Sequence, residues 1–388
     1  MISHMRNKGR VLVAMSGGID STMTAVMLKE QGYDVVGITM KTWDYESSGA
    51  TGKETGCCSL DSINDARTIA VEYDIPHYVL DLRAEFGDKI IRNFVSEYLS
   101  GRTPNPCVLC NTFIKWEALL DKADKLNCDY LATGHYAHLK QENGRWVIYK
   151  GRDSKKDQSY VLWGLTQDVL ARTLLPLGGL TKAEIRRMAL QRGYHQLVRK
   201  SESYEICFIP DNDYRAFLRR QAEKLGKYIG PGPLKLISGE VIGQHPGYPF
   251  FTIGQRKNLG VALGKPMYVV HIDPVKNEVV IGPREALRCR AMTVTGVNWI
   301  RYDHLDGPRG VITKVRYKHE GARARIRPAD DGRVEVEFLE PVYGVAPGQS
   351  AVFYEGDAVV GGGIITQTQS AHEVQNMAVA GAGPHRGV

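Results

Sequence analysis

The first 135 residues alternate short runs of apolar, β-branched residues with amphipathic segments. Four runs have the length and composition of buried strands, namely residues 11–15 (VLVAM), 34–40 (DVVGITM), 77–82 (HYVLDL) and 128–133 (CDYLAT). Strands that are separated by helices pair in parallel, because the chain must cross back over the sheet between them. The sequence therefore predicts an α/β domain with a doubly wound parallel sheet, whose ligands sit beyond the carboxyl ends of the strands.

The chain changes character after this region. From about residue 160 to 225 the pattern is helical, and a Gly- and Pro-rich stretch at 230–251 then opens a region of short strands and turns. We expect a catalytic domain over residues 1–217, a small central β domain over 218–288 and a C-terminal β-barrel over 289–368. The tail at 369–388 is small and polar, and we expect it to be disordered.

Composition bounds the compartment and the partners. No stretch approaches the roughly 20 apolar residues of a membrane helix, and the first residues lack the apolar centre of a secretion signal, so we expect a cytoplasmic protein. Seven scattered cysteines indicate reduced thiols rather than a disulfide framework. The net charge of +7 is matched by residues 284–327 alone, which hold 11 Lys and Arg against 4 Asp and Glu. A polyanion is a suitable partner for such a region.

The loop SGGIDS (16–21) follows the first predicted strand and precedes a predicted helix. Glycines allow a tight turn, hydroxyls add donors and the helix dipole favours negative charge, so this loop is suited to phosphate. It is neither a Walker loop nor a dinucleotide fingerprint, since GxxxxGK[ST] and GxGxxG are both absent. The alternative is a plain strand-to-helix turn that is capped by Ser16 or Asp20.

Three cysteines lie in segments that suggest chemistry. Cys107 and Cys110 belong to GRTPNPCVLCNTFIKW (101–116), and Cys207 belongs to SESYEICFIPD (201–211). A thiol near a helix N-terminus or a cation such as Lys115 can react as a thiolate. A zinc site would need a second pair of ligands, but the three thiols could instead hold an iron–sulfur cluster. The other four are interpreted as small buried hydrophobic residues, namely Cys57, Cys58, Cys128 and Cys289.

Together these segments resemble one family, the tRNA-specific 2-thiouridylases of the ATP pyrophosphatase superfamily, from about residue 9 to 366. SGGIDS is similar to the pyrophosphate loop of that superfamily, which has an adenine nucleotide alpha hydrolase-like fold. The more specific matches are GRTPNPCVLCN, CDYLATGHYAH, KDQSYVLWGL, SESYEICFIP, FFTIGQRKNLGV, KVRYKH and VAPGQSAVFY. The resemblance implies an enzyme that sulfurates the wobble uridine of tRNA, with ATP as activator and Mg²⁺ as its charge partner.

The resemblance also implies roles for single residues. Cys207 is similar to the persulfide carrier of the family, which receives sulfur from a cysteine desulfurase or a sulfur-relay protein. Cys110 is similar to its nucleophile, which releases that sulfur by forming a transient Cys110–Cys207 disulfide. The residues that would bind ATP are Ala14, Met15, Ser16, Gly17, Gly18, Ile19, Asp20, Ser21, Met40 and Gly134.

The substrate tRNA is expected to contact residues in both halves of the chain. By resemblance, Asn105, Pro106 and Cys107 touch the target base, although many members have Asp where this chain has Cys107. A thiol with a pKa near 8.5 does not replace an ionised carboxylate, so the acid–base role of that Asp does not transfer. The residues expected to contact the tRNA, through its anticodon stem-loop, are His135, Lys156, Asp157, Gln158, Arg316, Tyr317 and Gln349.

Period-two alternation predicts two basic strand faces in the C-terminal region, joined by a hairpin turn at 319–322. Lys314, Arg316 and Lys318 would form the first face, and the second would consist of Arg323, Arg325 and Arg327. The alternative is a solvated charged strand. His135 and His138 have a spacing that metals use, but no third ligand is visible and no metal site is predicted. A non-catalytic RNA-binding protein with a degenerate nucleotide loop is the alternative from another class.

Overall fold

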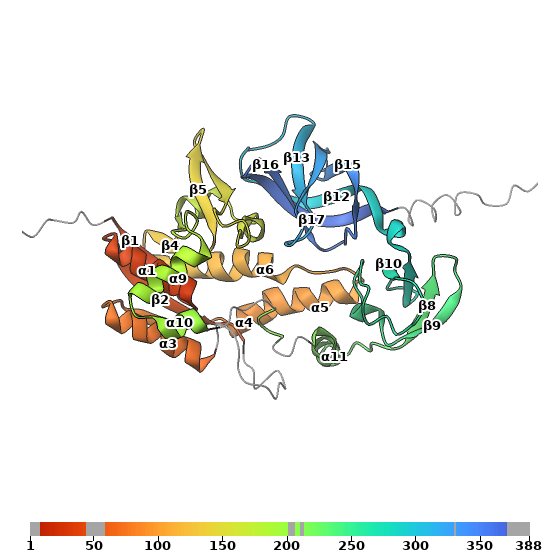
Figure 1. Ribbon diagram of the computed structural model, residues 1–388, viewed down its shortest axis with the longest axis horizontal. Helices are drawn as coiled ribbons and strands as arrows, with labels where there is room; N and C mark the ends of the chain where they lie inside the picture. Colours follow the sequence, from red (N-terminus) through yellow and green to blue (C-terminus); the bar gives the residue numbers. More distant parts are fainter. Residues whose placement is uncertain (1–7, 44–58, 201–205, 210–212, 330, 371–388) are drawn as a thin grey trace, which may run out of the picture.

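The computed structural model describes residues 8–43, 59–200, 206–209, 213–329 and 331–370. Its first sheet is parallel throughout and has the strand order β3-β2-β1-β4-β7 (Figure 1). The five strands are β1 (Arg10–Ala14), β2 (Asp34–Lys41), β3 (His77–Asp81), β4 (Tyr130–Ala132) and β7 (Thr173–Leu174). The four strands expected in the first 135 residues are therefore confirmed, and the short β7 is added at one edge.

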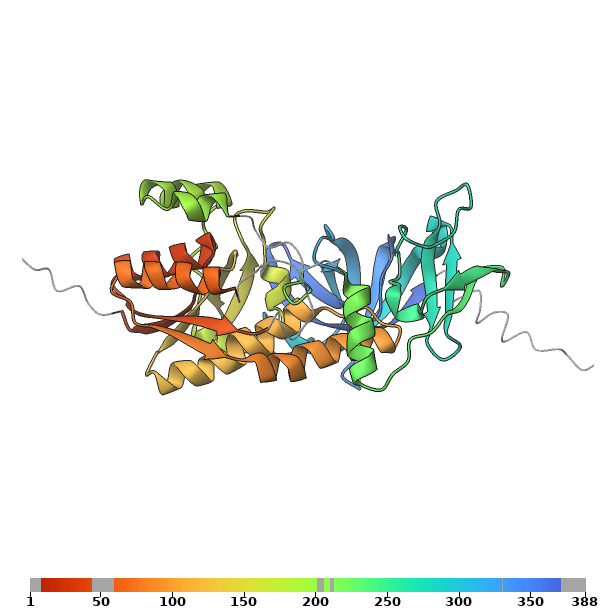
Figure 2. The ribbon, with the colours of Figure 1, turned by 90° about the horizontal axis from the view of Figure 1, so that it is seen from below.

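Helices cover both faces of this sheet, so the doubly wound arrangement is confirmed (Figure 2). Alternate residues of β1 enter two cores, with Val11 and Val13 on one face and Leu12 and Ala14 on the other. Helices that contribute to the Val11 face are α1 (Ile19–Glu30), α3 (Leu60–Glu72), α9 (Lys182–Gln191) and α10 (His195–Arg199). The Leu12 face is covered by α4 (Arg83–Phe86), η1 (Gly87–Ile91), α5 (Arg92–Leu99), α6 (Pro106–Leu109), η2 (Cys110–Ala118) and α7 (Leu119–Lys125).

Helix ends follow from local sequence. At the C-terminal end of α1, Gly32 adopts a φ of 89°, which side chains disfavour, and its N–H bonds the carbonyl of Lys29. Thr181 and Glu184 form a reciprocal capping box at the start of α9. The carboxylate of Asp213 accepts a hydrogen bond from the N–H of Ala216 and caps α11 (Tyr214–Lys224). The short helical elements that join the larger ones are η3 (Ser159–Leu162), α8 (Gln167–Ala171), η4 (Tyr248–Phe250) and η5 (Arg284–Leu287).

The central β domain is a four-stranded sheet with the order β10-β11-β8-β9. Its strands are β8 (Gly232–Leu236), β9 (Val241–His245), β10 (Tyr268–Asp273) and β11 (Glu278–Gly282). The buried side chains of Leu234, Val269 and Val279 join the core that also contains α5. The hydroxyl of Tyr248 donates to the carbonyl of Leu99 at 2.6 Å, so this domain is fastened to the end of α5.

The C-terminal region forms a closed barrel of six strands, because β12 pairs with both β15 and β17. The strands are β12 (Arg288–Trp299), β13 (Arg309–Lys314), β14 (Ala322–Pro328), β15 (Val334–Tyr343), β16 (Ser350–Glu355) and β17 (Ala358–Ser370). The expected order of catalytic domain, central β domain and barrel is confirmed. The predicted tail lies outside the described residues from 371 onward, as do Cys57 and Cys58.

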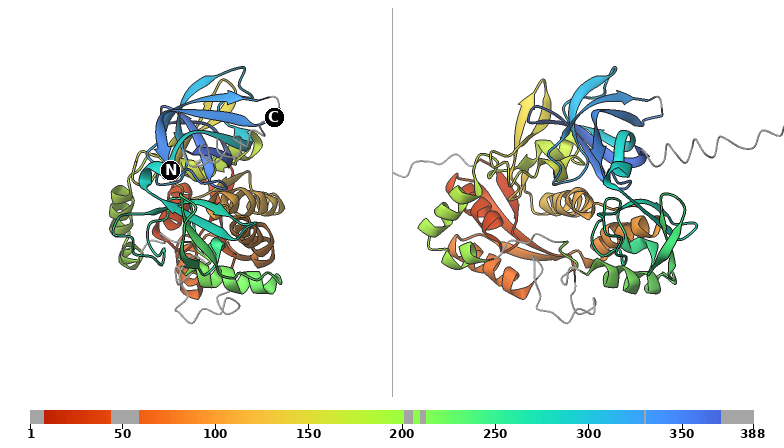
Figure 3. Two further views of the ribbon diagram at one scale, coloured as in Figure 1. Left: turned by 90° about the vertical axis from the view of Figure 1, so that its right-hand side faces the viewer. Right: turned by 45° about the vertical axis from the view of Figure 1, so that its right-hand side comes forward.

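A hairpin from the catalytic half extends the barrel sheet. It consists of β5 (Ala137–Glu142) and β6 (Arg145–Lys150), and β6 pairs with β17 at Tyr149 and Ala358. Asn298 of β12 also donates to the carbonyls of Trp163 and Leu165, at 2.7 and 2.9 Å. The barrel is thus held directly against the catalytic domain, and α5 and α6 lie between the parallel sheet, the barrel and the central domain (Figure 3).

The predicted strand over residues 314–319 is wrong. β13 ends at Lys314, and residues 315–321 form a connection to β14, in which the N–H of His319 bonds the carbonyl of Arg316. The hydroxyl of Tyr317 donates to the carbonyl of Asp157 at 3.1 Å, so a contact with the catalytic domain replaces strand pairing here. The hairpin between the two strands is confirmed, with a longer turn than expected. In the described part of the chain, no helix has the length and apolarity needed to cross a membrane.

Candidate active site

The loop between β1 and α1 has the geometry of an anion site. Gly17 adopts a φ of 69°, and Ser21 Oγ accepts from the N–H of Ser16 at 3.0 Å and donates to the carbonyl of Gly18 at 3.1 Å. Gly18 is the N-cap residue, and within the described ranges no side chain caps α1, so the alternative of a Ser16 or Asp20 cap does not hold. The first N–H groups and the positive end of the α1 dipole face the carboxyl edge of the sheet.

A buried lysine from a distant part of the chain lies at this loop. Lys182, the first residue of α9, reaches the two carboxylate oxygens of Asp20 at 2.8 and 2.7 Å, and the hydroxyl of Tyr136 donates to the same carboxylate at 2.7 Å. Lys182 is buried. No sequence motif indicated either partner of Asp20. The capping-box pattern TKAE marks the start of a helix, but nothing in it indicates which loop that helix start approaches.

The other two predicted nucleotide residues are at the same edge. A Cβ atom on Gly134 would lie 2.9 Å from the carbonyl carbon of Asp20, so the turn after β4 touches the first turn of α1. Met40, near the end of β2, is half-buried, and the neighbouring Thr39 hydroxyl donates to the carbonyl of Met15 at 2.8 Å. The structure therefore brings together the predicted residues of 14–21, Met40 and Gly134.

The loop before α6 is fastened by the C-terminal barrel. The side-chain amide of Gln349 donates to the carbonyl of Pro104 at 2.8 Å. The hydroxyl of Tyr160 lies 3.4 Å from Nδ2 of Asn105 and donates to the carbonyl of Ser350 at 2.9 Å. Two of the residues expected near the target base, Asn105 and its neighbour Pro106, therefore lie at the contact between catalytic domain and barrel. Gln349 uses its side chain to make this contact.

Cys107 and Cys110 lie on one continuous helical segment. α6 begins at Pro106 and runs directly into the π-helix η2, whose first residue is Cys110. π-turns inside helices occur often at functional sites. Cys107 is exposed and Cys110 is half-buried. Although its surface is accessible, Cys107 is surrounded by protein atoms, and desolvation raises the pKa of its thiol while the Lys115 ammonium opposes the shift. Cys107 is therefore protonated at neutral pH.

The raised pKa predicts how Cys107 reacts with pH. We expect its alkylation by iodoacetamide to accelerate about tenfold per pH unit from pH 7 to beyond pH 9, because only the thiolate reacts. Lys115→Gln removes the opposing ammonium and moves the profile to higher pH. Peptide mass spectrometry of timed samples measures both profiles. A plateau of the Cys107 rate below pH 8 contradicts the prediction.

Cys207 is exposed at the surface beside a buried aromatic anchor. Its neighbour Phe208 is 1% exposed and packs against Phe86 and Phe94, with ring centroids 5.6 and 5.2 Å away. Those two rings belong to α4 and α5, and η1 between them contacts α6. Phe208 therefore anchors the chain beside Cys207 to the α4–α5 run, and this run contacts α6, the helix that precedes Cys110.

The described residues contain no group of three His, Cys, Asp or Glu side chains that is close enough to hold a metal ion. Cys107, Cys110 and Cys207 are all described, so they are not assembled as ligands of an iron–sulfur cluster in this arrangement. Cys128 and Cys289 are buried, which confirms their interpretation as core residues.

Three residues expected to contact tRNA direct their polar groups inward. The carboxylate of Asp157 accepts from the N–H groups of Gly151 and Ser159, and the side chain of Gln158 accepts from the N–H of Tyr136. His135 is buried, with Nδ1 at 2.7 Å from the hydroxyl of Thr133. Burial and, to a lesser extent, Lys115 hold the pKa of His135 well below its usual range, so its ring is neutral at physiological pH.

Besides Gln349, which holds the loop before α6, three more of the expected tRNA contacts lie nearer the surface of the same junction. Lys156 is half-buried, and Arg316 and Tyr317 are exposed on the connection between β13 and β14. Arg316 reaches the carbonyls of Tyr343 and Gly344 at 3.4 Å. The ring centroid of Tyr317 lies 6.0 Å from that of the buried Tyr160, whose hydroxyl contacts Asn105. The connection therefore lies close to the loop before α6, which ends next to Cys107.

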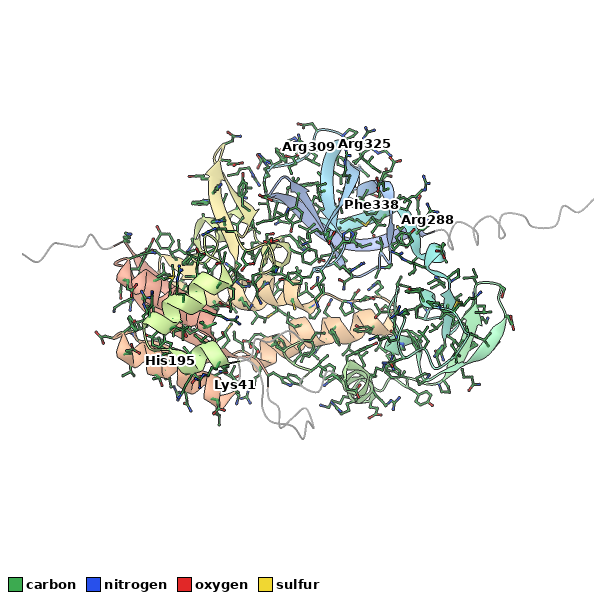
Figure 4. The ribbon with its side chains drawn as sticks, viewed as in Figure 1. Lys41, His195, Arg288, Arg309, Arg325 and Phe338 are labelled. Atoms are coloured by element: carbon green, nitrogen blue, oxygen red, sulfur yellow. The ribbon has the colours of Figure 1, made fainter. Side chains whose placement is uncertain are left out.

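The arginine face of β14 is compensated by the neighbouring strand. Arg323, Arg325 and Arg327 are exposed, as expected, and alternate with buried residues. Arg325 lies opposite Glu337 of β15, and Arg327 forms an ion pair with Glu335 at 2.5 Å. Figure 4 shows Arg325 at the top of the barrel, far from α6. The two predicted basic faces therefore do not form one surface. The first is a connection at the domain junction, and Arg325 and Arg327 of the second lie opposite glutamates.

Three family models match the chain in order. Residues 9–211 match the tRNA methyl transferase HUP domain, 217–283 the tRNA methyl transferase PRC-barrel domain and 289–365 the aminomethyltransferase beta-barrel domain. Curated relatives match over almost the whole length, but their name differs from the methyltransferase names of these models. Three of them, from Amoebophilus asiaticus, Cytophaga hutchinsonii and Salinibacter ruber, are each named tRNA-specific 2-thiouridylase MnmA.

The identities to these relatives are 60%, 57% and 53%. The alignments cover 92%, 93% and 95% of this chain and 95%, 98% and 97% of the relatives, respectively. Because these identities extend over almost the whole chain, the thiouridylase name of the relatives is preferred to the methyltransferase names of the domain models. The chain therefore belongs to the tRNA-specific 2-thiouridylase family, and it is a tRNA sulfurtransferase.

Proposed function

We propose that the enzyme converts the wobble uridine of tRNA to 2-thiouridine at the expense of ATP. The uridine C2 oxygen attacks the α-phosphorus of ATP and pyrophosphate leaves. Cys110 attacks the inner sulfur of a Cys207 persulfide, which releases hydrosulfide and forms a Cys110–Cys207 disulfide. Hydrosulfide adds to C2, and AMP departs with the former C2 oxygen. The observation that carries this proposal is the glycine-turned start of α1, which no described side chain caps. Cys110 at the start of η2 and Cys207 beside the α4–α5 run supply the two thiols.

The phosphate loop supports the nucleotide part of the proposal. Gly17 is in the left-handed region, no described side chain caps α1, and Lys182 supplies a buried ammonium at Asp20. A polyphosphate fits such a cradle. Mg²⁺ would be held chiefly by the phosphates, because the described residues offer no three-ligand group of their own.

We propose that ATP binds at residues 14–21, Met40 and Gly134, and that the target base meets Asn105, Pro106 and Cys107. The contacts of Gln349 and Tyr160 with that loop support this assignment, since they fasten it to the barrel. We retain domain limits of 1–217, 218–288 and 289–368, which agree with the three matched ranges. The sulfur donor is a cysteine desulfurase or a sulfur-relay protein, and the enzyme acts in the cytoplasm.

The reaction is tested by its stoichiometry. With tRNA, ATP and a persulfide donor, we expect one AMP and one pyrophosphate for each 2-thiouridine formed, because both products leave the same activated base. Nucleoside analysis of the tRNA and quantification of AMP measure the ratio. A tRNA whose wobble position is cytidine is the control and should release no AMP above background. Thiolation without AMP release would contradict the proposal.

The tRNA surface is tested by salt dependence. We expect Lys318→Gln and Arg316→Gln each to weaken tRNA binding and to reduce the slope of log K against log salt by about 1, because each removes one phosphate contact. Arg325→Gln is the matched control. It should leave the slope unchanged, since Arg325 already faces Glu337. If Arg325→Gln changed the salt slope more than Lys318→Gln, the tRNA would bind the arginine face of β14 instead.

A further inference from the structure

The chain contains a thiol that the proposed reaction does not use. Cys107 is exposed on the first turn of α6, three residues before Cys110. Cβ atoms three or four residues apart on a helix are about 5–6 Å apart, and a disulfide needs about 3.5–4.5 Å. If the two Cβ atoms moved roughly 1–2 Å closer, the sulfurs of Cys107 and Cys110 could therefore form a disulfide. The first turn of a helix can make such a shift, because its N–H groups are not held by intrahelical bonds.

Each turnover of the proposed reaction leaves the enzyme oxidised by two electrons, as a Cys110–Cys207 disulfide. This disulfide must be reduced before the next persulfide can be loaded. Phe208 is buried among Phe86 and Phe94, so the chain next to Cys207 is anchored while Cys207 itself is exposed. Cys107 is the thiol that adjoins Cys110 on the same helical segment.

We propose that Cys107 is a resolving thiol that regenerates the enzyme, an inference that rests on the proposed Cys110–Cys207 disulfide. The Cys107 thiolate attacks Sγ of Cys110, the Cys110–Cys207 bond breaks, and Cys207 leaves as a thiolate that takes up a proton. A Cys107–Cys110 disulfide results. A protein dithiol of the thioredoxin class then supplies two electrons and two protons, is itself oxidised to a disulfide, and restores both thiols.

The surroundings of Cys107 suit this role. Its exposed surface leaves room for a protein reductant, and the Lys115 ammonium favours its thiolate. Desolvation raises its pKa, so only a small fraction of Cys107 is thiolate at neutral pH, and its attack on Cys110 should accelerate as the pH rises. The resolving role therefore rests on its place beside Cys110 on one helical segment.

The test uses full-length enzyme with its persulfide loaded in advance. Wild type, Cys107→Ser and Cys107→Asp are compared in a single turnover and then in repeated turnovers with thioredoxin and its reductase as electron source. Because the target base is also proposed to meet Cys107, the repeated-turnover rate of each variant is compared with the yield of its own first turnover. In repeated turnovers both variants should be at least about tenfold slower than wild type. Without Cys107, thioredoxin itself must attack the Cys110–Cys207 disulfide. Dithiothreitol should restore them.

The disulfides formed when reductant is withheld identify the step. Non-reducing peptide mass spectrometry should find Cys107–Cys110 in wild type and Cys110–Cys207 in Cys107→Ser. Repeated turnover of Cys107→Ser at the wild-type rate with thioredoxin would overturn the resolving role, as would rescue by Cys107→Asp, which would make position 107 an acid–base site. If Cys107→Ser completes its first turnover without any Cys110–Cys207 disulfide, the proposed reaction itself fails, which is a different outcome.

Discussion

Replacing Cys110 or Cys207 by serine is expected to abolish 2-thiouridine formation, by at least about 1,000-fold, because a hydroxyl neither carries a persulfide nor displaces sulfur from one. Cys107→Ser should keep substantial thiolation in the presence of dithiothreitol. The difference follows from the roles proposed for the three sulfurs, since Cys110 and Cys207 take part in sulfur release and Cys107 acts only afterwards. Nucleoside analysis of tRNA from a deletion strain, rescued with each variant, measures the effect.

Pyrophosphate release separates this loss from misfolding. Cys110→Ser and Cys207→Ser should still activate the tRNA, because the phosphate loop lies at the ends of β1, β2 and β4 and contains neither cysteine. Equal loss of thiolation in the Cys107 and Cys110 variants under dithiothreitol would speak for three equivalent ligands of an iron–sulfur cluster. Iron content and an absorbance band in anaerobically purified protein would then be the next measurements.

The second large effect is expected for Gly17→Ala. Gly17 has a φ of 69°, and a Cβ atom would lie 2.1 Å from the carbonyl oxygen of Ser62 at the start of α3. Because that carbonyl is backbone, the loop must move away from α3. A displacement of about 1 Å at a reacting centre costs on the order of 100-fold in rate, so we expect AMP formation to fall by at least that factor.

Gly18→Ala is the matched control for the stability of this loop. Its φ of −98° suits any residue, and the nearest atom to an added Cβ is Ser16 Oγ at 3.5 Å. We expect Gly17→Ala to lower the melting temperature and Gly18→Ala to leave it unchanged in thermal denaturation. If Gly17→Ala melts like the wild type and forms AMP at the normal rate, the contact between the loop and α3 has no part in shaping the phosphate site.

Local patterns predicted the elements that carry the chemistry. The strand VLVAM is buried on both faces, and SGGIDS forms the turn before α1, because apolar runs and glycines act within a few residues of chain. The alternation in Arg323, Arg325 and Arg327 likewise produced the expected exposed positions on β14. The same kind of pattern failed at 314–319, where Tyr317 meets the distant Asp157.

Sequence alone determined a parallel α/β domain with a phosphate-type loop, a central β domain, a barrel and the family to which they belong. Only the tertiary structure decided that Lys182 reaches Asp20 from 162 residues away, that β6 joins β17, and that Arg325 faces Glu337. The physical reason is the range of the interactions. Strands, turns and helix starts are set by neighbouring residues, whereas ion pairs and sheet extensions depend on which surfaces the packed domains bring together.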